Sequence, residues 1–167
     1  MGGFKFDHPP LLAPGRHFTC LSRLESICVG PFPGSKVRSE LFSKLCALVD
    51  AFTKMGLPCE MLVNGSFLTG KLNPSDVDVA VIIDPDVAEN MTESKEGLIN
   101  DVNDNNFIEG VDAFVETLFP IGHPSFRANG NEMLWSEQYG REHNGEYLKG
   151  IAVLRIGETD VGLRIRR

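Results

Sequence analysis

Two aspartates and a nearby Gly-Ser pair are the residues of this sequence whose types and spacing could do chemistry. Asp76 and Asp78 are separated by one valine and open an apolar run that ends at Ile83. If this run forms a strand, both carboxylates project from the same face of it. Two neighbouring carboxylates repel each other unless a cation binds them, and rigid oxygen ligands suit Mg²⁺. The spacing therefore predicts a magnesium site with Asp76 and Asp78 as ligands.

Gly65 and Ser66 could supply the phosphate contact of such a site. A strand predicted over residues 59–63 leads into Gly65, whose missing side chain allows close approach of the backbone to a ligand. A short helix predicted over residues 67–72 would direct backbone N–H groups, with the Ser66 hydroxyl, toward a triphosphate. Lys71 could touch the phosphates or could be a solvated lysine on a turn, and the sequence leaves both open.

The same segment also spells a competing phosphate-binding pattern. Gly65 to Lys71 matches the glycine-rich loop of a P-loop NTPase, which needs a Ser or Thr after the lysine and a helix continuing from the loop. Leu72 stands in place of the hydroxyl residue, and Pro74 opposes a continuing helix. The sequence therefore favours the other interpretation, in which a strand leads into Gly65-Ser66 and the paired aspartates follow on the next strand.

The elements that must position these residues alternate between helices and strands. Prolines predict an extended leader over about residues 1–34 that wraps the domain, and residues 119–145 are predicted to be mostly loop. Periodicity predicts a mixed α/β fold, a mixed β-sheet flanked by helices, within a single domain over residues 1–167. The expected helices span residues 35–55 and 86–100, and the expected strands span residues 59–63, 76–83, 111–115, 149–156 and 161–165.

Composition and charge narrow the class of ligand. The chain has 167 residues, 42% of them hydrophobic, and a net charge of −7. Its apolar runs are strand-sized, shorter than the ~18 residues of a membrane span, so no membrane association is expected. The acidity disfavours nucleic acid and favours a small ligand or a protein partner. The basic group of Lys36, Arg38 and Lys44 is interpreted as a solvated helix face.

The four cysteines indicate a reducing compartment. Cys20, Cys28, Cys46 and Cys59 are widely spaced, without a C-x-x-C pair, and no secretory leader opens the chain. We therefore expect reduced thiols in a cytoplasmic protein.

Gly65-Ser66 followed by Asp76-x-Asp78 in an apolar strand resembles the signature of the DNA polymerase β-like nucleotidyltransferase superfamily, particularly its small members, the minimal nucleotidyltransferases. The resemblance is strongest over residues 59–84 and extends more weakly to residue 115. The proline-rich leader and the strand that begins at Lys149 also look similar to an uncharacterised bacterial subgroup of these proteins.

The resemblance implies a Mg²⁺-dependent enzyme that moves a nucleoside monophosphate, expected to be AMP from ATP, from an NTP to a hydroxyl group. Asp76 and Asp78 would be joined by a third catalytic and metal-binding carboxylate from a later strand. Asp112 is the match, and Asp160 is the fallback. Gly65, Ser66 and Lys71 would bind the nucleotide.

The resemblance also bears on partners. Small members often pair with a toxin or another partner protein, so the acceptor is expected to be a protein hydroxyl or a small molecule. The alternative is a non-catalytic, nucleotide-binding or antitoxin-like interaction module on the same fold. A third interpretation comes from the residues alone: Asp101, Asn103, Asn105 and Asp112 have the spacing of a calcium-binding EF-hand loop, although Asn106 stands where the loop needs Gly.

Overall fold

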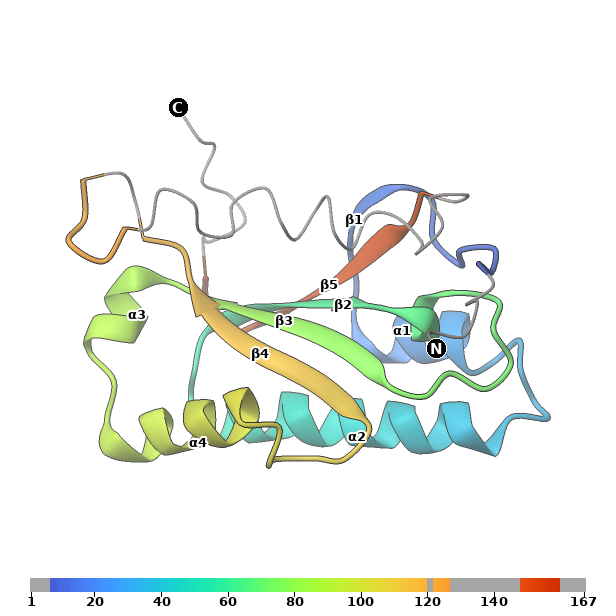
Figure 1. Cartoon of the computed structure of the whole chain (residues 1–167), viewed down its shortest axis with the longest axis horizontal. Helices are drawn as coiled ribbons and strands as arrows, with labels where there is room; N and C mark the ends of the chain where they lie inside the picture. Colours follow the sequence, from blue (N-terminus) through green and yellow to red (C-terminus); the bar gives the residue numbers. More distant parts are fainter. Residues whose placement is uncertain (1–6, 120–121, 127–147, 160–167) are drawn as a thin grey trace, which may run out of the picture.

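The computed structural model describes residues 7–119, 122–126 and 148–159. In these residues, helices pack on a five-stranded mixed β-sheet (Figure 1), which confirms the expected mixed α/β class. The elements are β1 (Gly15–Phe18), α1 (Leu21–Cys28), α2 (Lys36–Lys54), β2 (Cys59–Asn64), the single-turn 3₁₀ helix η1 (Ser66–Leu68), β3 (Val77–Ile83), α3 (Pro85–Glu89), α4 (Glu93–Asn103), β4 (Val111–Thr117) and β5 (Gly150–Ile156).

The sheet order β1-β5-β2-β3-β4 places segments from both ends of the chain side by side. β2 is antiparallel to both of its neighbours, β3 and β5, whereas β3 pairs with β4, and β1 with β5, in parallel. The register pairs Asn64 with Asp78 across β2 and β3, and Asp78 with Asp112 across β3 and β4. Two of the predicted site aspartates are therefore direct cross-strand neighbours.

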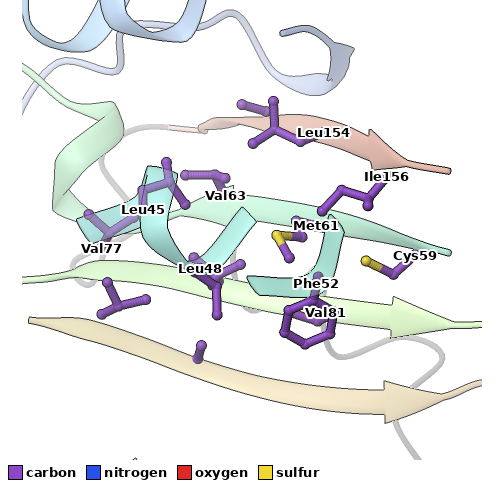
Figure 2. Close-up of a cluster of buried hydrophobic side chains, with 14 of the residues drawn as sticks. Leu45, Leu48, Phe52, Cys59, Met61, Val63, Val77, Val81, Leu154 and Ile156 are labelled. Atoms are coloured by element: carbon purple, nitrogen blue, oxygen red, sulfur yellow. The ribbon is translucent and has the colours of Figure 1, made fainter. Parts of the chain in front are cut away.

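The hydrophobic core lies between one face of the sheet and helices α1, α2 and α4, which contribute to a single buried cluster. Figure 1 shows α2 and α4 on the same side of the sheet. Val77, Val79 and Val81 of β3 are at most 1% exposed and belong to this cluster, as their alternation with Asp78 predicted. Figure 2 shows side chains of β2, β3 and β5 packed against α2: Leu45, Leu48, Phe52, Cys59, Met61, Val63, Val77, Val81, Leu154 and Ile156.

Helix α2 follows the predicted range closely because both of its ends are capped. The Ser35 hydroxyl accepts the Arg38 N–H at 3.3 Å at the N-terminus. At the C-terminus, Gly56 adopts φ +56° and donates its N–H to the Thr53 carbonyl at 3.0 Å. Leu57 donates to the Phe52 carbonyl at 3.0 Å, which completes a Schellman motif.

The expected leader and the expected helix over residues 86–100 differ from the structure. The leader is not extended throughout, because β1 and α1 form between Pro14 and Pro31, which bracket these elements without interrupting them. The single helix predicted over residues 86–100 is wrong: α3 and α4 are separate. The Asp84 carboxylate caps α3 by accepting the Asp86 N–H at 3.0 Å, and Thr92 is extended before α4 begins. Gly97, an expected weak point, lies inside α4.

Several expectations fall on other parts of the chain. The strand predicted over residues 161–165, the fallback Asp160 and most of the predicted loop over residues 119–145 lie outside the described residues. Within the described residues, no helix combines the length and apolarity that crossing a membrane requires.

Candidate functional site

Gly65 forms a corner against which the Asp78 carboxylate lies. β2 leads directly into Gly65, which adopts φ +76° and ψ −165°, a conformation essentially restricted to glycine. A Cβ atom added to Gly65 would overlap Asp78 Oδ2 and lie 2.7 Å from Asp78 Cγ. The Asp78 carboxylate therefore occupies the space that a side chain at residue 65 would fill. The structure brings Gly65 and Asp78 together, as the sequence predicted.

Asp78 and Asp112 are register partners on neighbouring parallel strands. Since Val77, Val79, Val111 and Ala113 belong to the core cluster, alternation places Asp78 and Asp112 on the opposite face of the sheet. Asp112 is exposed and Asp78 is partly buried. Asp76 lies one residue before β3 and is also partly buried.

Asp76 and Asp112 both line an open groove with a volume of about 500 Å³. The groove lies between α2, the segment before β3 and the segment that enters β4. Its charged lining residues are Glu40, Lys44, Asp76, Glu109 and Asp112.

The helix predicted over residues 67–72 is wrong in extent, because η1 ends at Leu68. Thr69 is extended and bridges to Pro10, and Gly70 donates its N–H to the Pro9 carbonyl at 2.8 Å. The leader thus draws this part of the chain into an extended path. The hydrogen bonds of the single turn η1 are donated by the N–H groups of Leu68 and Thr69. The helix itself therefore does not use the N–H groups of Ser66 and Phe67.

Arg38 binds residues 67–71, which we call the corner segment. The interpretation of Arg38 as part of a solvated helix face is therefore wrong. The residue is 0% exposed. Its guanidinium donates to the carbonyls of Cys28 at 2.8 Å, Phe67 at 2.9 Å and Thr69 at 2.6 Å. It also donates to the Lys71 carbonyl, from Nε at 3.2 Å and from a terminal nitrogen at 2.6 Å. Desolvation lowers the pKa of Arg38, but an arginine remains protonated.

The periodicity of α2 contained a partial signal for this residue. Arg38 is three positions before Leu41 and four before Phe42, which are both buried, so it lies on the apolar stripe of the helix. The main chain of Lys71 is fixed by Arg38 and by a bond from its N–H to the Thr69 hydroxyl at 3.3 Å. A phosphate contact by the Lys71 side chain stays a prediction.

A divalent cation fits the donor chemistry of the paired aspartates. Among residues 7–119, 122–126 and 148–159, no group of three or more His, Cys, Asp or Glu side chains is placed to hold a metal ion. Mg²⁺, however, is commonly held by one or two carboxylates together with substrate phosphates, not by a cage of protein ligands. Asp78, which lies against Gly65, and its register partner Asp112 match that arrangement.

The EF-hand spacing does not form a calcium loop. Asp101 and Asn103 lie in α4 and Asp112 lies in β4, so the segment is a helix, a turn and a strand. The Asn103 side-chain oxygen accepts the Val115 N–H at 2.7 Å and thus links α4 to β4.

A second charged cluster, which the sequence did not indicate, lies near the other end of β2. Glu60 is 1% exposed and accepts hydrogen bonds from Arg16 at 2.6 Å and Arg155 at 2.9 Å. These residues belong to β2, β1 and β5, so the cluster ties three strands together.

The fold and the site together define a mixed α/β domain in which a Gly-Ser corner meets paired aspartates on adjacent strands. The chain belongs to the family described as "Family of unknown function (DUF6932)", whose profile matches residues 4–155. No curated protein and no solved structure matches the chain.

Proposed function

We propose that this protein is a nucleotidyltransferase that transfers a nucleoside monophosphate, expected to be AMP, from an NTP to a hydroxyl group of a partner protein or small molecule. One observation carries the proposal. The Asp78 carboxylate lies against Gly65, which has a backbone conformation that only glycine adopts readily, and Asp78 is the register partner of Asp112. Two carboxylates fixed beside the start of a helical turn could hold a divalent cation that carries the phosphates of a nucleotide.

The residues of this site have separate roles in the proposal. Ser66 and the N–H groups at the start of η1 would bind the phosphates, and Lys71 would add a positive charge. Asp78 and Asp112, together with the nucleotide phosphates, would hold Mg²⁺, which when bound neutralises charge at the phosphates and makes the α-phosphorus easier to attack. Asp76, one residue before β3, would lie beside this pair. Because Asp76 and Asp112 line the groove, an acceptor in it would lie next to these two residues.

The proposed reaction is a single displacement at the α-phosphorus. The acceptor hydroxyl oxygen forms a bond to this phosphorus, and its proton moves to a carboxylate, for which we propose Asp112. The bond from the α-phosphorus to the oxygen bridging the β-phosphate breaks, and its electron pair leaves with pyrophosphate.

The test is transfer of label from α-labelled NTPs in the presence of Mg²⁺ and an extract of the host cells. Wild type is compared with Asp76→Ala/Asp78→Ala and with Asp112→Asn, and Asp101→Asn on α4 is the matched control. We expect transfer with wild type and with the control variant, and loss with the other two. Transfer that survives Asp76→Ala/Asp78→Ala would overturn the mechanism, and ATP binding without transfer would favour the non-catalytic module.

A further inference from the structure

The corner segment, residues 67–71, rests on a buried arginine that has no acidic partner among the described residues. In the described part of the chain, the ion pairs involve other residues, and Arg38 forms none with a carboxylate. The carbonyls of Cys28, Phe67, Thr69 and Lys71 surround its guanidinium instead. The guanidinium carbon also lies 3.8 Å from the ring centroid of Phe32. Burying an arginine is costly, so this arrangement calls for a functional or structural reason.

The geometry gives Arg38 control over the main chain that follows Gly65. Three of its four carbonyl partners, Phe67, Thr69 and Lys71, lie on the segment that begins at the corner, and the fourth ends α1. A planar guanidinium can bind several carbonyls in fixed directions, whereas a lysine ammonium is a point charge on a flexible stem. The path of residues 67–71 therefore depends on an arginine at this position.

The same contact supplies charge. The guanidinium is a positive charge that water does not screen and that the surrounding carbonyl dipoles offset only in part. Any anion at the Gly65-Ser66 corner lies next to the segment that this cation holds.

We infer that Arg38 is a positioning residue of the proposed nucleotide site: it fixes residues 67–71 and makes the corner selective for polyphosphate. The inference rests on the proposed function. It requires that binding of ATP depend on Arg38 through the phosphates, and that Lys not replace Arg.

The experiment compares wild type, Arg38→Lys and Arg38→Met in binding of ATP and of adenosine with Mg²⁺, at a temperature where each variant is folded. Lys36→Met is the matched control, because Lys36 is exposed on the same helix and its replacement removes the same charge. We expect both Arg38 variants to bind ATP roughly tenfold more weakly or worse, and Lys36→Met to bind it as wild type does. If the Arg38 variants lose the preference of wild type for ATP over adenosine, the effect of Arg38 on binding acts through the phosphates.

Amide hydrogen exchange is measured on the same samples. We expect faster exchange at residues 67–71 in both Arg38 variants, with β2 and β3 still protected. If Arg38→Met does not fold, Arg38→Lys, which keeps the charge, decides the question. Folded Arg38 variants that bind ATP like wild type, or that exchange residues 67–71 like wild type, would overturn the inference.

The nucleotide site and the positioning role of Arg38 can be tested separately. If wild type binds no nucleotide, the proposed function fails and the polyphosphate role of Arg38 fails with it. Exchange at residues 67–71 in Arg38→Lys still decides whether Arg38 positions the segment.

Discussion

Gly65 illustrates how one absent side chain can determine a site. Replacement by alanine would force a residue with a Cβ into φ +76° and would also place that Cβ in the volume of the Asp78 carboxylate. We expect Gly65→Ala to lower the free energy of unfolding by about 1–3 kcal/mol through backbone strain and to abolish binding of ATP with Mg²⁺. Urea denaturation and a binding titration measure the two effects.

Gly56→Ala is the control that separates the effect of backbone strain from the effect of displacing Asp78. Gly56 also has positive φ, +56°, but an added Cβ would meet nothing within 4 Å. This variant should lose roughly 1 kcal/mol of stability, because a left-handed helical residue is less restricted than Gly65, and should bind ATP normally. If Gly65→Ala also binds ATP normally, the close approach of Gly65 and Asp78 is not part of a nucleotide site.

The cysteines should differ sharply in reactivity. Cys20 is exposed, and a side-chain hydrogen bond with Ser22 lowers its pKa. Burial raises the pKa of Cys28 and of Cys59 to about 12. Since the thiolate is the reactive form, iodoacetamide at pH 8 should modify Cys20 first and leave Cys28 and Cys59 unmodified until the protein unfolds. Mass spectrometry of the alkylated peptides checks the order, and early labelling of Cys59 would contradict the burial.

The same two thiols make stability depend on pH in the alkaline range. Their pKa is about 12 in the folded protein and 9.0 without burial, so between these values the unfolded chain has lost protons that the folded chain retains. Their contribution is complete below pH 9 and is lost as the pH rises toward 12. Urea denaturation at pH 8 and pH 11 should show this decline, and Cys28→Ala/Cys59→Ala should show a smaller one. An equal decline in both proteins would contradict the assignment.

The site was predictable from the sequence only where spacing alone determines contact. Asp78 next to Gly65 follows from two strands joined by a short connection. The alignment of Asp112 with Asp78 depends on parallel pairing and register, and Asp112 was predicted through the family resemblance, not from spacing. Arg38 and Glu60 were missed for another reason: a charged residue type suggests a solvated surface, and their burial depends on partners distant in the chain.

At the scale of elements, the start of α2 links the helix to the segment that precedes Asp76. The Ser35 hydroxyl accepts the Arg38 N–H and donates to the Asn73 side-chain oxygen at 2.9 Å. We expect Ser35→Ala to lower the free energy of unfolding by about 1 kcal/mol, as for other N-cap residues. Urea denaturation measures this change.

Ser39→Ala is the control for this prediction. Ser39 is exposed inside the same helix, where alanine is the better helix former, so the free energy of unfolding should change by less than about 0.5 kcal/mol. Equal effects of the two substitutions would show that the cap contributes nothing specific.

Elements with a regular apolar period were predictable, and those that depend on local contacts were not. α2 and strands β2 to β5 follow their three- to four-residue or alternating patterns. η1 is shorter than predicted because the leader pairs with Thr69 and Gly70, a contact between distant segments. The separation of α3 from α4 depends on polar caps in a segment whose apolar pattern alone suggested one helix.

At the scale of the whole molecule, Glu60 joins strands from both ends of the chain. Arg155→Met would leave the buried Glu60 carboxylate with Arg16 alone. Because the arginine side chains are 42% and 34% exposed, we expect a loss of roughly 1–3 kcal/mol in the free energy of unfolding, less than for a fully buried pair.

A double-mutant cycle isolates the interaction between these two residues. Glu60→Met/Arg155→Met should be less destabilised than the sum of the single substitutions, because no buried charge is left with a missing partner. Additive effects, measured by urea denaturation, would contradict the coupling.

The place of β5 between β1 and β2 has a consequence for biosynthesis. Gly15 pairs with Gly150, so during synthesis β1 has no partner until a segment far later in the chain has been made. Such distant pairing slows folding, and until then β1 and one edge of β2 stay open to incorrect pairing. A nascent chain that ends before β5 should therefore bind chaperones, and a nascent chain that includes β5 should bind them less because the sheet can close.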